Sequence, residues 1–147
     1  MGNRGVTVDR LECIRYPDSG PWVAEVMEQP SWESIVRAVE RLDRAAYPMV
    51  YLHLASAVGG EHPVHALEIV GGRGEYAITV WLPDEMVRFT DPNRVGDVVD
   101  LLERDQGAFL EAHERCTDLS LVLTIADHFS KTGQPYEQVA WERELRI

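Results

Sequence analysis

Two apolar segments separated by four residues constrain the fold most strongly. His65–Val70 and Glu75–Leu82 are rich in β-branched and aromatic residues, which favour strands, and Gly71-Gly72-Arg73-Gly74 lies between them. Glycines that bind phosphate lead from a strand into a helix N-terminus. Here the second segment continues as a strand, so the glycines predict a hairpin turn. We therefore expect an antiparallel sheet.

Other segments predict the remaining strands of this sheet. Apolar and branched residues, bounded by turn residues, recur at 6–16, 22–27, 50–55, 86–89 and 138–142. The segment 97–104 fits a helix about as well as a strand. Because Asp105-Gln106-Gly107 resembles a tight turn and 108–113 can return as a strand, we favour a hairpin there.

The first helix is expected at about 31–45. Ser31 is a good N-cap, since its hydroxyl can accept a hydrogen bond from a free N–H of the first turn. Apolar residues then recur at helical spacing through Leu42, and Pro48 is expected to end the helix. Trp32 is expected in the core.

The second helix is expected at about 118–131. Thr117 or Asp118 can cap its start, and Gly133 can end it in a left-handed conformation, with Pro135 beyond. The fold class is therefore α+β: a single domain over 1–147, with a mainly antiparallel sheet and two main helices.

Length and composition agree with one folded domain. A chain of 147 residues with 45% hydrophobic residues can bury a substantial core. No apolar run is long enough to span a bilayer, and the first residues lack a secretory signal, so we expect a cytoplasmic protein without membrane contact. Cys13 and Cys116 are expected to be free thiols in a reducing compartment, although sequence leaves a single disulfide open.

The charge distribution favours a protein partner over nucleic acid. The net charge is −11, and residues 84–118 hold ten acids and four arginines. Such a surface repels phosphate, so we expect no direct nucleic-acid binding. It attracts and steers a basic protein, although an acidic surface can also serve solubility alone.

The sequence contains no catalytic signature. No serine lies in a nucleophile-elbow motif, and neither cysteine has a neighbour that plainly activates it. His62 and His65, with Glu61 beside them, form a local cluster that can ligate a metal, but Pro63 forbids the helical spacing of zinc enzymes. We therefore predict a protein that is not an enzyme and needs no cofactor, with a metal-binding enzyme as the alternative.

The C-terminal third resembles a known family. The run Ala126-Asp127-His128-Phe129-Ser130-Lys131-Thr132-Gly133-Gln134-Pro135, followed by Val139-Ala140-Trp141, is similar to the C-terminal signature of the first-numbered immunity-protein family of bacterial polymorphic toxin systems. The helix from Trp32 and the Leu67-Glu68-Ile69 strand with its glycine turn also match, so the resemblance covers about 22–142. Asp105-Gln106-Gly107 departs from the more glycine-rich turn expected there. The matching Phe129, Gly133, Pro135 and Trp141 look structural.

The resemblance implies an antidote to a toxin. Members of this family neutralise toxin domains, many of them nucleic-acid deaminases, whose substrate surface is basic because it holds phosphates. The implied partner is a basic cognate toxin domain, with its active site or substrate surface blocked. A generic interaction adaptor is a further alternative. From charge, the interface residues are predicted to be Glu61, Asp84, Glu85, Asp91, Asp105 and Glu111.

Overall fold

The computed structural model describes residues 8–54, 65–102 and 109–146. Its elements, in chain order, are β1 (Val8–Arg15), β2 (Val23–Glu28), α1 (Trp32–Glu40), β3 (Met49–Leu54), β4 (Ala66–Gly72), β5 (Glu75–Trp81), β6 (Glu85–Thr90), β7 (Val99–Asp100), β8 (Phe109–Leu110), the 3₁₀ turn η1 (Ala112–Glu114), α2 (Leu119–Thr132) and β9 (Ala140–Leu145).

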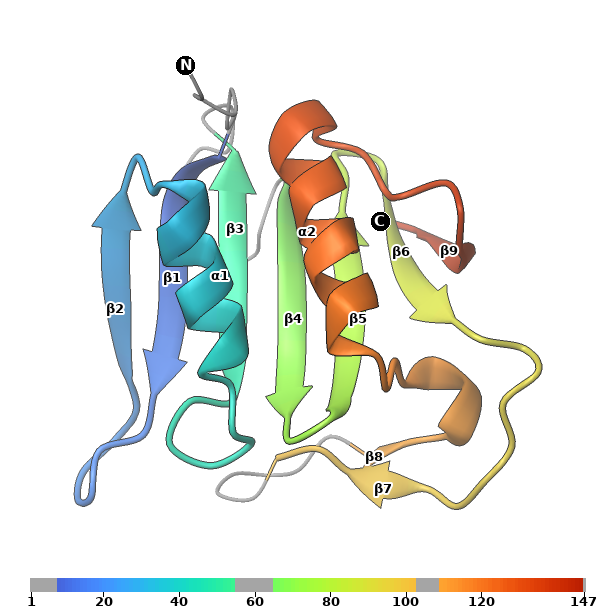
Figure 1. Cartoon of the computed structure of the whole chain (residues 1–147), viewed down its shortest axis with the longest axis horizontal. Coiled ribbons are helices and arrows are strands. Elements are labelled where there is room, and N and C mark those ends of the chain that lie inside the picture. The colour runs from blue at the N-terminus through green and yellow to red at the C-terminus, as the bar shows by residue number, and fades with distance from the viewer. Residues whose placement is uncertain (1–7, 55–64, 103–108, 147) are drawn as a thin grey trace.

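One sheet organises the described chain. Its seven strands run in the order β2-β1-β3-β4-β5-β6-β9, and every neighbouring pair is antiparallel. Helices α1 and α2 lie side by side on one face of this sheet (Figure 1). The predicted α+β class, with an antiparallel sheet and two main helices, is confirmed.

The core lies between the sheet and the two helices. Alternate strand residues, such as Leu52, Leu67 and Val80, point toward the helices and are fully buried, as expected for the covered face of a sheet. The largest side chains that are less than 2% exposed are Phe129, Ile35, Leu52, Leu67, Ile69, Ile78, Leu101 and Ile125. Burying one such aliphatic side chain contributes about 1.5–3 kcal/mol, so this layer is the main source of stability.

The β4–β5 connection is the predicted hairpin turn. Gly72 pairs with Glu75, leaving Arg73 and Gly74 as the two loop residues, with φ of 54° and 86°. Positive φ at both positions is the geometry that matches the twist of the flanking strands. Gly72 also touches the chain after α1: a Cβ there would lie 2.5 Å from the carbonyl of Leu42.

Helix α1 is shorter than predicted. Ser31 caps its start by accepting from the Ser34 N–H at 3.1 Å, but the last helical residue is Glu40 rather than a residue near 45, and Pro48 does not end it. The side chain of Asp43 accepts hydrogen bonds from the N–H groups of Ala45 and Tyr47, at 3.0 and 2.8 Å. These bonds hold a turn that competes with the helix, a known property of aspartate.

Helix α2 has the predicted ends. Asp118 accepts from the N–H of Ser120 at 2.9 Å, and Gly133 follows the helix with φ of 71° while donating to the carbonyl of Phe129 at 2.8 Å. This is the left-handed end that favours glycine. Among the described residues, no helix is both long and apolar enough to cross a bilayer.

Residues after β6 form the ambiguous region. Strands β7 and β8 pair antiparallel, as the favoured hairpin requires, but each has only two residues and 112–114 forms η1 instead of continuing the predicted strand over 108–113. The predicted turn at Asp105-Gln106-Gly107 lies outside the described residues. The η1 turn and α2 follow, and β9 returns to pair with β6 along the edge of the sheet. The predicted edge strand near the C-terminus is therefore confirmed, shifted to 140–145.

Candidate binding surface

The second face of the sheet is covered by neither α1 nor α2. Strand registers place one row of side chains across this face, each opposite the next. We call it the polar row, and it consists of Glu12, Tyr51, Glu68, Thr79, Arg88 and Glu142. Side chains in a strand point alternately to the two faces of the sheet. Because the residues of the polar row alternate with core residues along six strands, they point away from the helices.

At the β1–β3 end of the row, a carboxylate and an imidazole pair. The Oε1 atom of Glu12 lies 2.9 Å from Nε2 of His53, and the His53 ring stacks on Tyr51 with 5.8 Å between centroids. The hydrogen bond to His53 lowers the pKa of Glu12. Burial raises the pKa of Tyr51, with the Glu68 charge adding to this, so its hydroxyl stays protonated.

At the centre of the row, Glu68 is half-buried on a strand with neighbours on both sides. The indole N–H of Trp81 donates to its Oε1 atom at 2.8 Å. Burial nevertheless raises the pKa of Glu68, and neither this hydrogen bond nor the nearby Arg88 fully offsets the loss of hydration. Ionisation of this carboxyl therefore lowers the stability of the fold.

A concavity of about 310 Å³ opens around this carboxylate. Its floor is formed by β4, β5 and β6, and Leu110 and Glu114 from the β8–η1 segment form one wall. The sheet residues that line it include Glu68, Thr79, Trp81, Met86 and Arg88. Aromatic and methionine side chains with a few polar groups are the composition of a protein-binding surface.

The described acids of the predicted interface lie at two ends of β6. Asp84 lies in the β5–β6 turn, and Glu85 begins β6, where it pairs with Arg143 at 2.7 Å. Asp91 follows β6 at its other end, where its N–H donates to the carbonyl of His113 at 2.7 Å, close to Glu111. The two groups are about 20 Å apart by strand length, on either side of the concavity. Glu61 and Asp105 lie outside the described residues.

The described histidines serve local structure. His65 places Nε2 2.7 Å from the carbonyl oxygen of Gly133 and contacts the Phe129 ring edge-on. His62, its partner in the predicted metal cluster, lies outside the described residues. Among described groups, Glu111, His113 and Glu114 bring ligand atoms within 4.8 Å of one another and can hold a cation, but the Glu114 carboxylate already caps the Glu111 N–H at 2.9 Å.

The four residues that carry the predicted resemblance to immunity proteins occupy structural positions. Phe129 is fully buried in the core, and Gly133 ends α2. Pro135 is half-buried in the segment that leads to β9. Trp141 is half-buried, packs edge-to-face on Phe89 at 6.3 Å, and donates its indole N–H to the carbonyl of Tyr136 at 2.8 Å. The prediction that these residues are structural agrees with their positions.

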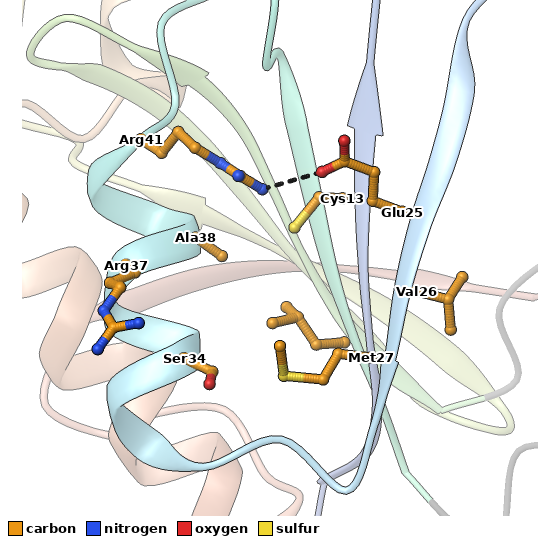
Figure 2. Close-up of a pocket in the computed structure, with 9 residues that line it drawn as sticks. Cys13, Glu25, Val26, Met27, Ser34, Arg37, Ala38 and Arg41 are labelled. Atoms are coloured by element: carbon orange, nitrogen blue, oxygen red, sulfur yellow. Dashed lines mark hydrogen bonds and ion pairs between the residues drawn. The ribbon is translucent and has the colours of Figure 1, made fainter.

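A second concavity, of about 330 Å³, lies between α1 and strands β1 and β2. Figure 2 shows Cys13 and Met27 directed toward it, with Arg41 paired to Glu25 at its end, 3.4 Å apart. Burial raises the pKa of both Cys13 and Cys116, so each stays a thiol and is a poor nucleophile. Both are free and buried, as predicted.

The polar row was not singled out from the sequence, although a signal for it exists. In β3, Tyr51 and His53 alternate with Val50, Leu52 and Leu54, and Glu68 interrupts an otherwise apolar β4. A charge inside an apolar central strand indicates a face that helices do not cover. We instead read these strands only for their number and order.

Comparison with known proteins finds a solved structure with a similar fold, and its description assigns no function. A crystal structure of a hypothetical protein from Neisseria gonorrhoeae is similar to this chain, with a TM-score of 0.58 and 15% sequence identity. The similarity covers 92% of this chain and 94% of that one, so the two share the fold. No family model matches the chain, and comparison with curated proteins gave no match.

Proposed function

We propose that this protein is an immunity protein that binds a cognate toxin domain in the cytoplasm of the producing cell and neutralises it. The observation that carries the proposal is the helix-free face of the sheet, where a concavity surrounds the half-buried carboxylate of Glu68. Burial disfavours the charge of this carboxylate, and its hydrogen bond from Trp81 offsets the loss of hydration only in part. A cationic side chain of a partner that enters the concavity regains the lost electrostatic energy.

Charge complementarity supports a basic partner. The net charge of −11 and the acids at both ends of β6 attract a basic surface, such as that of a toxin that holds nucleic-acid phosphates. Trp81 and Met86 supply apolar contact area beside Glu68. In tight complexes, charges at the rim of the interface speed association and apolar contacts at its centre slow dissociation. The acids at the ends of β6 and the apolar side chains beside Glu68 match this arrangement. The resemblance of the C-terminal segment to immunity proteins supports the same conclusion.

The proposal predicts a toxin gene next to the gene for this chain, and co-expression with the product of that gene tests it. The wild-type protein is expected to restore growth and to form a one-to-one complex, and Glu68→Lys is expected to weaken that complex at least 100-fold, since a buried like charge costs several kcal/mol. The matched control is Glu33→Lys, which makes the same charge change at an exposed position on α1 and should leave protection intact.

A second variant separates charge from shape. Thr79→Arg keeps Glu68 but fills the concavity beside it, and it should also abolish protection. Thermal denaturation of each variant verifies that it is folded. If wild-type protein gives no protection, the proposed function is wrong. If Glu68→Lys and Thr79→Arg protect as well as Glu33→Lys, the toxin binds elsewhere.

A further inference from the structure

The two edges of the main sheet differ in composition. At one edge, β9 carries three consecutive charged residues, Glu142 to Glu144. Charges on an edge strand are a common protection against pairing with another chain. At the other edge, β2 and the residue before it carry four of the eight large hydrophobic side chains that are exposed in the described chain: Trp22, Val23, Val26 and Met27. No described segment lies beyond β2 (Figure 1).

The backbone of β2 has a defined set of free groups. The N–H of Gln29 donates to the carbonyl of Asp9 at 2.7 Å, and Glu28 lies opposite Arg10. Inward and outward backbone groups alternate in an antiparallel pair, so Glu25 and Met27 bond to β1 as Gln29 does. Ala24, Val26 and Glu28 therefore present their N–H and carbonyl groups outward, to the open edge.

From these observations we propose that β2 pairs antiparallel with β2 of a second copy of this chain, which gives a symmetric dimer with one continuous sheet. This inference does not depend on the proposed function. An antiparallel pair of identical strands has a two-fold axis perpendicular to the sheet, so both copies contribute the same surface and the assembly closes at two. Pairing β2 with β9 of a second copy would instead leave free edges and continue without closure.

The charges on β2 select the register. Two registers pair nearly the full length of β2 with β2 of the second copy. In both registers, the outward N–H and carbonyl groups of one copy face the outward groups of the other. One places Glu25 opposite its own copy, and the other places Val26 opposite its own copy with Glu25 opposite Met27. Like charges directly opposite each other are destabilising, so the register centred on Val26 is the favoured one. It forms about six backbone hydrogen bonds, two for each of three residue pairs.

The surroundings of β2 suit this register. Arg15 at 2.7 Å and Arg41 at 3.4 Å hold the Glu25 carboxylate on the α1 side of the sheet in each copy. Glu25 and Met27 point toward α1, whereas Val26 points to the other face of the sheet (Figure 2). The Val26 side chains of the two copies then meet on the helix-free face, where each is 53% exposed in the single chain.

Sedimentation analysis of the full chain over a range of concentrations tests the dimer. Wild-type protein is expected to shift from a 16.6 kDa monomer to twice that mass in the micromolar range, and added salt should favour the dimer because two copies of net charge −11 repel at long range. Val26→Lys should lower the association constant at least 100-fold. Val95→Lys, at another exposed valine that is 90% accessible, is the matched control and should dimerise as wild type does.

Cysteine cross-linking tests the register. Opposed Cα atoms in a hydrogen-bonded pair lie about 5.5 Å apart, which a disulfide can span. Oxidised Val26→Cys should therefore form a covalent dimer, whereas Ala24→Cys, which lies opposite Glu28 of the second copy, should not. A wild-type chain that stays monomeric at several hundred micromolar overturns the proposal, as does a dimer that Val26→Lys leaves unchanged. Cross-linking between an Ala24→Cys chain and a Val26→Cys chain, in place of Val26→Cys with itself, indicates the register centred on Glu25 and overturns the proposed register.

Discussion

Replacing Gly133 by alanine probes the junction between α2 and the C-terminal segment. Gly133 has φ of 71°, a conformation that costs an alanine about 1–2 kcal/mol. A Cβ atom there would also lie 3.0 Å from Cδ1 of Leu54 and 3.3 Å from Cε1 of His65. Leu54 is in the core and the His65 ring is bonded to the Gly133 carbonyl, so neither can move freely. Overpacking of this kind adds about 1–3 kcal/mol.

The expected total for Gly133→Ala is therefore about 2–5 kcal/mol of lost unfolding free energy. Gly74→Ala is the matched control, because Gly74 also has positive φ, 86°, but has no atom within 4 Å of the added Cβ. It should lose only the backbone contribution of about 1–2 kcal/mol. Urea denaturation followed by tryptophan fluorescence measures both. Equal losses in the two variants would refute the argument that Leu54 and His65 pack tightly against the end of α2.

Two further comparisons use paired variants. Glu12→Gln and Glu68→Gln should change stability in opposite directions at pH 7: the lowered pKa of Glu12 means that its charge stabilises the fold above the ordinary carboxyl range, whereas the raised pKa of Glu68 means that its charge destabilises the fold there. In thermal denaturation, the Glu12 difference should shrink as the pH falls below the ordinary carboxyl pKa of about 4, whereas the Glu68 difference should already shrink as the pH falls toward that value from above. The same sign for both variants at pH 7 would contradict the electrostatic assignment. In urea denaturation, Phe129→Ala should cost about 3–5 kcal/mol. Trp141→Ala should cost less, about 2 kcal/mol, because Trp141 is only half-buried, and an equal loss would mean that β9 is packed as tightly as the core.

Local sequence rules predicted most of the elements. The glycine turn before Glu75, the cap at Asp118 and the left-handed residue at Gly133 are each determined by neighbouring residues, and all three occur as expected. The end of α1 was predicted wrongly because Pro48 looked like the stop signal. The actual determinant is the Asp43 side chain, which stabilises a turn, and its backbone bridge to Gly72 is a tertiary contact that sequence does not show.

The candidate site was less predictable than the fold. Charge counting drew attention to residues 84–118, but it cannot tell that Asp84 and Asp91 lie at opposite ends of one strand. The concavity between them is formed by β4, β5 and β6 together with a segment some 20 residues later, so it depends on sheet order and register. Glu68 becomes informative only when β4 is known to be a central strand with one face free of helices.

The position of α2 late in the chain has a consequence for synthesis on the ribosome. Strands β3 to β6 are neighbours in sequence and in the sheet, so they can pair as soon as they emerge. Helix α1 precedes them, but the part of their apolar face over β4 and β5 stays uncovered until Val122, Ile125 and Phe129 of α2 have left the exit tunnel. For some 30 residues of translation, the nascent chain therefore exposes the apolar surface of an incomplete sheet. Such partly folded species are prone to aggregation. Slow translation after β6 should thus increase the dependence of this protein on chaperones.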